Sequence, residues 1–241
     1  MRPVERGASP IAGDYRDHRD AFGALTNRLG GLYCSYCERR IPTNLAVEHI
    51  QPKAPHRYPH LAGRWDNFLL ACVNCNSTKK EKDVTLADEA LPDRDNTFAA
   101  YQYRADGTIH PATTLSPSQR LLAERTLSLV GLDKDVSAVY DENDQLVVAD
   151  RKAQRLEVRL IAKRALSRLQ VRRTPEMVDQ IVETALGQGH FSTWMDVFEA
   201  EAAVRSELIV QFSAARACFD PSTTLPVTPR PPNGLPHAGK I

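Results

Sequence analysis

The first apolar pattern along the chain is helical. Apolar residues recur at three- and four-residue spacing at Phe22, Leu25 and Leu29. This spacing predicts a helix from Tyr15 to Leu29. The pair Gly30-Gly31 is expected to end it, because glycine breaks a helix and readily begins a turn.

Two short apolar runs follow, and each is predicted to be a strand. The first covers residues 45–50 and is ended by Pro52, and the second covers residues 68–71. The segment 53–66 between them holds several prolines and glycines and is expected to be an exposed loop. The polar run 76–82 offers Asn, Ser and Thr for capping and is predicted to begin a helix. Strand, loop, strand and helix in this order form a ββα unit.

The rest of the chain is predicted to be mostly helical. A hairpin is expected over residues 99–110, turning on Asp106-Gly107. Four helices are expected after it, over residues 116–130, 151–173, 174–187 and 192–217. Beyond Asp220 the chain has six prolines and little apolar periodicity, which predicts a poorly ordered tail.

Two Cys-x-x-Cys pairs, Cys34/Cys37 and Cys72/Cys75, bracket the two predicted strands. Each pair can form a tight knuckle whose thiolates face one ion, and two knuckles complete a tetrahedral four-thiolate zinc site. The N-terminus lacks the apolar core of a signal peptide, so zinc is favoured over disulfides. Cys218, the fifth cysteine, is expected to be a small buried apolar residue.

Length and hydropathy limit the architecture. At 241 residues the chain can bury one sizeable core or two small ones. No apolar run is long enough to span a bilayer, so we expect no membrane partner and a cytoplasmic location. The prediction is an α+β protein. It has a zinc-stapled ββα unit over residues 1–83, a mostly helical domain with a small hairpin over 84–219, and the tail over 220–241.

A net charge of +1 conceals strong local segregation. Residues 151–173 hold nine Arg and Lys against the single acid Glu157. Steps of four residues give a charged stripe through Arg151, Arg155, Arg159 and Lys163. Arg155 and Arg159 are therefore candidates for contact with nucleic-acid phosphates. The alternatives are pairing with the acidic segment 133–150 just upstream, plain solvation and contact with a partner protein.

The segment between the cysteine pairs holds residues suited to phosphodiester cleavage. Neutral imidazole, here His49, can deprotonate water near pH 7, and a divalent cation can stabilise the charge that grows at phosphorus. The Glu48 carboxylate and the Asn76 amide are hard oxygen ligands that suit Mg²⁺ or Mn²⁺. Neighbours on a strand point to opposite faces, so Glu48 and His49 converge only if a twist or bulge redirects one.

These motifs resemble the zinc-containing HNH endonucleases of the ββα-metal superfamily. The matching positions are Cys34-x-x-Cys37, Glu48-His49-Ile50-x-Pro52, Asp66-Asn67-x-Leu69 and Cys72-x-x-Cys75-Asn76-x-x-Lys79. The resemblance implies that His49 is the general base and that Asn67 orients it. It also implies that Glu48 and Asn76 hold the catalytic metal, and that the four cysteines hold a structural zinc. The family more often has Asp before the histidine, and many members have His in place of Asn76.

A looser resemblance concerns the whole chain. The opening Met-Arg-Pro-Val-x-Arg-Gly, the early Tyr-Cys-Ser-Tyr-Cys-Glu and the helical second half are similar to the nuclease component of Septu-type and retron-associated bacterial defence systems. Those nucleases work with an ATPase partner. The resemblance therefore implies an antiviral effector that acts together with an ATPase.

The function expected from the sequence is metal-dependent hydrolysis of nucleic-acid phosphodiester bonds, with DNA as the expected substrate. Lys79 and Lys80 are expected to contact a flanking phosphate, since amides at a helix N-terminus already favour one. The alternative is a non-catalytic zinc module that binds nucleic acid or a protein through the same surface. A nuclease that is silent until a partner activates it is a further alternative.

Overall fold

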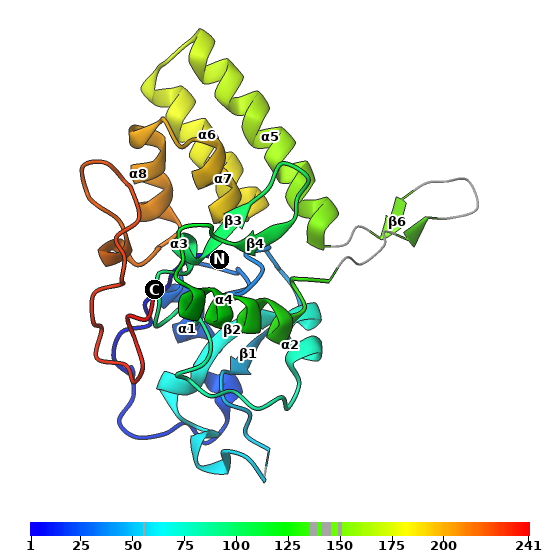
Figure 1. Ribbon diagram of the computed structural model, residues 1–241, viewed down its shortest axis with the longest axis vertical. Helices are drawn as coiled ribbons and strands as arrows, with labels where there is room; N and C mark the ends of the chain where they lie inside the picture. The colour runs from blue at the N-terminus through cyan, green and yellow to red at the C-terminus, as the bar shows by residue number, and fades with distance from the viewer. Residues whose placement is uncertain (55, 135–138, 141–145, 149–150) are drawn as a thin grey trace.

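The two predicted strands form one hairpin at the centre of the N-terminal half. The computed structural model describes residues 1–54, 56–134, 139–140, 146–148 and 151–241. Strand β1 (Leu45–His49) pairs antiparallel with β2 (Phe68–Cys72), and the five residue pairs run consecutively from Leu45–Cys72 to His49–Phe68. Helix α2 (Val73–Lys79) follows β2 directly. The predicted ββα unit is confirmed (Figure 1).

Helix α2 begins earlier than predicted. Its first residue is Val73, with Cys72 as the N-cap, whereas the sequence predicted a start at Asn76. The earlier start places Cys72 and Cys75 within one helical turn, so both thiols lie on the same side of the chain. Asn76 therefore lies in the middle of the helix, and Lys79 is its last residue.

The first predicted helix is shorter than the spacing indicated. A 3₁₀ helix over His18–Ala21 leads into α1 (Phe22–Arg28). Tyr15 stays outside because its backbone N–H donates to the Gly63 carbonyl at 2.9 Å. The side chain of Asp17 caps the 3₁₀ helix by accepting from the Arg19 N–H. The predicted start at Tyr15 is therefore wrong.

The next elements match their sequence signals. A short helix α3 (Thr97–Ala100) leads into the predicted hairpin, which consists of β3 (Tyr101–Tyr103) and β4 (Ile109–Pro111). Helix α4 (Pro117–Val130) begins with a Ser116–Gln119 capping box and ends at Gly131, which has φ 67°. Strands β5 (Val139–Tyr140) and β6 (Leu146–Val148) pair beyond it. One alternative for the basic helix was pairing with the acidic segment 133–150. Most of that segment lies outside the described residues.

The C-terminal helices pack together at the end of the molecule opposite β1 and β2 (Figure 1). They are α5 (Arg151–Val171), α6 (Pro175–Gln188), α7 (Phe191–Val197) and α8 (Ala202–Gln211). The prediction of a single helix over residues 192–217 is wrong, because the structure has two separate helices, α7 and α8, in this range. The chain turns after Val197 because Phe198 is fully buried, with its ring stacked 6.1 Å from that of Trp194. None of the helices in the described part of the chain is long and apolar enough to cross a membrane.

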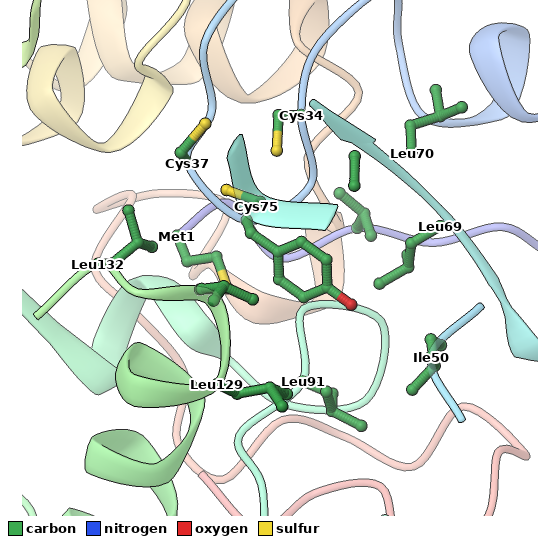
Figure 2. Close-up of a cluster of buried hydrophobic side chains, with 14 of the residues drawn as sticks. Met1, Cys34, Cys37, Ile50, Leu69, Leu70, Cys75, Leu91, Leu129 and Leu132 are labelled. Atoms are coloured by element: carbon green, nitrogen blue, oxygen red, sulfur yellow. The ribbon is translucent and has the colours of Figure 1, made fainter. Parts of the chain in front are cut away.

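The buried apolar residues form two clusters. The first joins residues between Met1 and Leu132 with Ile241, and the second joins Tyr33 with residues between Val158 and Phe219. Figure 2 shows Cys34, Cys37 and Cys75 bordering apolar side chains of the first cluster, such as Leu132. The division of the chain at residue 83 stays a prediction.

The N-terminal segment is tied down by arginines. Arg2 Nη2 donates to the Leu29 carbonyl at 2.6 Å, and Arg2 Nη1 donates to the Phe212 carbonyl. Arg6 pairs with Asp93 at 2.7 Å. The Met-Arg-Pro-Val-x-Arg opening therefore contributes to the fold, since Arg2 joins the end of α1 to the end of α8.

The C-terminal segment 220–241 is packed against the first half, so the expectation of a poorly ordered tail is wrong. Buried Arg230 donates to the carbonyls of Val4 and Pro92, both at 3.1 Å. The Ile241 carbonyl accepts from Asn96 N at 2.9 Å, and the Ile241 side chain is fully buried. An arginine side chain and backbone groups make these contacts. Such contacts produce no apolar periodicity, so the sequence pattern could not reveal them.

Candidate active site

The four paired cysteines form a compact cluster. Their Sγ atoms all lie within 4.8 Å of one another, and those of Cys37 and Cys72 are 3.6 Å apart. A tetrahedral site with Zn–S distances of about 2.3 Å places its sulfurs about 3.8 Å apart. The donor set and its spacing therefore suit a structural zinc ion.

Two arginines that sequence reasoning did not connect with the cysteines support the cluster. Arg39 Nη2 donates to Cys72 Sγ at 3.2 Å, and Arg151 Nη1 donates to Cys75 Sγ at 3.3 Å. Such N–H donors stabilise the negative charge of metal-bound thiolates. Arg151 comes from the basic stripe of α5, so one residue of that stripe serves the cysteine cluster. No local sequence signal distinguishes it from its neighbours.

A cleft of about 450 Å³ lies at the end of β1. The polar and ionisable residues that line it are His18, Glu48, His49, Lys53, Asn76, Lys80 and Glu81. The structure therefore brings the predicted base and the predicted helix ligand, His49 and Asn76, to one cavity. They come from β1 and from the middle of α2.

The ring of His49 is held in a defined tautomer. Its Nε2 lies 2.9 Å from the Ala62 carbonyl, and its ring meets Phe68 edge-on at 5.2 Å. A carbonyl can only accept, so Nε2 carries the hydrogen and Nδ1 keeps the lone pair. Burial lowers the pKa of His49 to about 4, against a raising effect of the Ala62 carbonyl. His49 is therefore neutral at pH 7 with one basic nitrogen.

The carboxylate of Glu48 is occupied by other protein groups. Its Oε1 lies 2.7 Å from Lys79 Nζ, and its Oε2 accepts from the Tyr36 hydroxyl at 2.9 Å. Burial raises the pKa of Glu48, and the charge of Lys79 opposes that shift. β1 has no bulge at this point, so Glu48 and His49 keep the opposite directions expected of strand neighbours.

The amide of Asn67 ties two loops around the histidine. Its Oδ1 accepts from Gln51 N at 2.8 Å, and its Nδ2 donates to the carbonyls of Gln51 at 2.9 Å and Leu61 at 3.3 Å. The Asn67 carbonyl also accepts from Ile50 N at 2.8 Å. Among the described residues, no hydrogen bond joins the Asn67 side chain to the His49 ring. Asn67 holds the chain just after His49 and just before Ala62.

The helix α2 presents Asn76 to the cleft and turns Lys79 away from solvent. Asn76 is half-buried, and within the described residues its side-chain amide makes no hydrogen bond. Lys79 is 1% exposed and donates to the His49 carbonyl at 2.7 Å as well as pairing with Glu48. Lys80 is exposed in the cleft wall. Both lysines lie at the C-terminal end of α2, so the helix-N-terminus argument for a phosphate there is wrong.

The two arginines predicted to contact nucleic acid lie elsewhere and are used inside the fold. Arg155 is 4% exposed and donates to the Gly107 carbonyl. Arg159 pairs with Asp196 at 2.7 Å and donates to the Tyr103 carbonyl at 3.3 Å. Neither residue belongs to the wall of the cleft. They fasten α5 to the β3–β4 hairpin and to α7.

His18 is a cleft residue to which sequence reasoning assigned no role. Its ring centroid lies 4.7 Å from that of His49, and its Nδ1 lies 3.3 Å from Lys53 Nζ. Burial, with the charge of Lys53, lowers the pKa of His18 below its usual value. His18 lies far from the motif in the sequence. Only the packing of the 3₁₀ helix against β1 brings the two rings together.

Comparison with known protein families identifies the central segment. Residues 34–82 match the HNH endonuclease family, and this range contains the four cysteines, Glu48, His49, Asn67 and Asn76. No curated protein matches the chain. The chain therefore contains an HNH endonuclease domain with a four-cysteine cluster that suits zinc, followed by a helical region.

Proposed function

We propose that this protein is a metal-dependent endonuclease that hydrolyses phosphodiester bonds of nucleic acid, with DNA as its substrate. The observation that carries the proposal is the meeting of His49 and Asn76 in one cleft inside the HNH domain. A base and a metal ligand that line the same cleft can act together on a phosphate and an attacking water bound there.

His49 acts as the general base. The Ala62 carbonyl holds the Nε2–H at 2.9 Å, so Nδ1 is the nitrogen that accepts the proton of water. Asn67 positions the histidine indirectly, because its amide fixes the chain at Gln51 and Leu61 on the two sides of this hydrogen bond. The geometry is therefore held by backbone contacts on both flanks of the ring.

The Asn76 amide fits the role of a ligand for Mg²⁺ or Mn²⁺, because it is a hard oxygen donor without a competing hydrogen bond among the described residues. Such a cation, when bound, stabilises the charge that develops on the phosphate and the leaving oxygen. Glu48 fits this role poorly, since Lys79 and Tyr36 hold both of its oxygens. We propose that Glu48 instead positions His49, through the bond from Lys79 to the His49 carbonyl.

The lysines at the mouth of the cleft are the proposed phosphate contacts. Lys53 and Lys80 are exposed and belong to its wall, whereas Lys79 is buried in an ion pair. Arg155 and Arg159 hold the helical region together. Binding of nucleic acid near the cleft therefore depends on the first two lysines.

The direct test is a plasmid-nicking assay with Mn²⁺ that compares the wild type with His49→Ala. Loss of a general base is expected to reduce the cleavage rate by about 10²- to 10⁴-fold. His56→Ala, which removes an exposed histidine of the adjacent loop, serves as the matched control and should cut normally. Cleavage that survives in His49→Ala would remove this histidine as the base.

The dependence of cleavage on pH is a separate expectation. Because the pKa of His49 is lowered to about 4, the free enzyme keeps its base unprotonated well into the acid range. At saturating Mn²⁺, kcat/KM should stay level down to about pH 5 and fall about tenfold per pH unit below about pH 4, whereas an ordinary histidine loses activity below about 6.5. A midpoint near 6.5 would contradict the burial argument.

The biological setting proposed is that of a cytoplasmic antiviral effector that works with an ATPase, as Septu-type and retron-associated nucleases do. Its support is the resemblance of the opening segment, whose Arg2 and Arg6 are buried in the fold. Adding a candidate ATPase partner should raise cleavage, and only with His49 intact. If neither protein cuts with or without that ATPase, a non-catalytic zinc module that binds nucleic acid or a protein is the better description.

A further inference from the structure

The cleft that holds His49 contains a second imidazole. His18 begins the 3₁₀ helix His18–Ala21 and lines the cleft together with His49 and Asn76. The centroids of the two imidazole rings are 4.7 Å apart, and their planes are tilted by 53°. The family match covers residues 34–82, so His18 lies outside it. The fold therefore adds to the cleft a histidine that does not belong to the matched motif.

The ring of His18 is held in one tautomer. Its Nδ1 lies 3.3 Å from Lys53 Nζ, and an ammonium group can only donate, so Nδ1 accepts and Nε2 carries the hydrogen. An oxygen of Asp17 lies 3.4 Å from the same nitrogen, but the carboxylate of Asp17 accepts from the N–H groups of Arg19. Burial, with the charge of Lys53, lowers the pKa of His18. The ring is therefore neutral at pH 7.

The Nε2–H group of His18 has no acceptor within the part of the chain that the structure describes. The side chain is 24% exposed, and its ring belongs to the wall of the cleft. His49 differs, because the Ala62 carbonyl accepts the hydrogen of its Nε2. The donor of His18 is therefore available to a molecule that enters the cleft.

The charges around the cleft favour an anion as that molecule. Lys53 and Lys80 are exposed in its wall. Of the two carboxylates in the wall, that of Glu48 is already paired with Lys79, which leaves the exposed Glu81. Two cations and a neutral N–H donor suit the oxygens of a phosphodiester, since hydrogen bonds to charged acceptors are the stronger ones.

We propose that His18 is a further catalytic residue of the nuclease and that its Nε2–H donates to a non-bridging oxygen of the scissile phosphate. This role rests on the nuclease function proposed above. The proton stays on Nε2, and the hydrogen bond strengthens as negative charge grows on the phosphate oxygens. Coordination of the catalytic cation would need a free nitrogen lone pair, and Lys53 holds the one at Nδ1.

The test separates the donor of His18 from its ring. His18→Phe keeps an aromatic ring beside His49 and removes the donor, so kcat/KM for plasmid nicking with Mn²⁺ should fall at least about tenfold. His18→Gln carries an amide N–H near the position of Nε2 and should recover part of this loss. His18→Asn, whose shorter amide lies near the position of Nδ1, should not.

The matched control is His60→Phe, because His60 is exposed, lies outside the wall of the cleft and should leave nicking unchanged. The Tm of each variant shows whether it is folded, and the comparison of Gln with Asn stands even if the Phe variant is not. Equal nicking by the wild type and His18→Phe, or by the Gln and Asn variants, overturns the proposal. A higher Mn²⁺ requirement in His18→Phe also overturns it, since it would make His18 a metal ligand.

Failure of the nuclease proposal looks different, because it appears as a wild type that does not cut or as a His49→Ala variant that does. Binding of a short DNA duplex without Mn²⁺ then tests His18 independently of cleavage. The affinity should fall at least about fivefold from the wild type to His18→Phe and stay unchanged in His60→Phe. Equal affinities of the wild type and His18→Phe would exclude a phosphate contact by His18.

Discussion

Chelation of zinc is expected to unfold the N-terminal half of the protein and to abolish cleavage. The cysteine cluster joins the knuckle at Cys34 and Cys37 to the junction of β2 and α2, where Cys72 and Cys75 lie. Structural zinc sites contribute about 10–16 kcal/mol of apparent binding free energy at pH 7, most of which is folding free energy. Without the ion, no bond would join the four cysteine side chains, and the ends of the hairpin that carries His49 would no longer be held.

The measurement is thermal unfolding by circular dichroism before and after treatment with a strong chelator, with zinc quantified per chain. One equivalent of zinc should be released, together with a large fall in Tm. Cys72→Ser should reproduce the loss. Cys218→Ala is the matched control, because Cys218 is equally buried but lies outside the cluster. A chelated protein that keeps both its Tm and its cleavage would show that the cluster has no structural role.

Lys79→Met is expected to destabilise the protein by about 3–5 kcal/mol, because it leaves the carboxylate of Glu48 buried without its cation. Lys79 and Glu48 are 1% and 2% exposed, and their charged atoms are 2.7 Å apart. The substitution also removes the donor to the His49 carbonyl. Cleavage should therefore fall even at temperatures where the variant is still folded.

Urea denaturation measures the first effect, and Lys80→Met is the control, since loss of this exposed neighbour should change the free energy of unfolding by no more than about 0.5 kcal/mol. The double variant Lys79→Met with Glu48→Leu separates the two effects. It removes the unpaired charge and should regain most of the stability. Full recovery of cleavage in the double variant would contradict a positioning role for the pair.

Local patterns in the sequence predicted the elements around the site well. The capping residue Ser116 and the terminating Gly131 bound α4 as expected, and the apolar runs at 45–50 and 68–71 became β1 and β2. These signals succeed because caps, turns and apolar periodicity act over a few residues. Where a boundary was wrong, as at Tyr15 and Asn76, a distant hydrogen bond or the geometry of the cysteine cluster determined it.

The roles of charged side chains were harder to predict. Arg155 and Arg159 looked like a solvent-facing stripe, yet each binds a backbone carbonyl of the β3–β4 region. Arg230 anchors a segment whose composition indicated disorder. Helical spacing shows which residues share a face, but it does not show what packs against that face.

The amino-acid sequence alone was sufficient to identify the ββα arrangement, the cysteine quartet and His49, because residue type and spacing determine each of them locally. The pairing of Glu48 with Lys79 and Tyr36, and the approach of His18 to His49, became visible only in the folded chain. Strand alternation requires Glu48 and His49 to point in opposite directions, but it does not specify what covers each face, and both residues are buried. The covering contacts depend on how α2 and the 3₁₀ helix pack against β1, and these segments lie far apart in the chain.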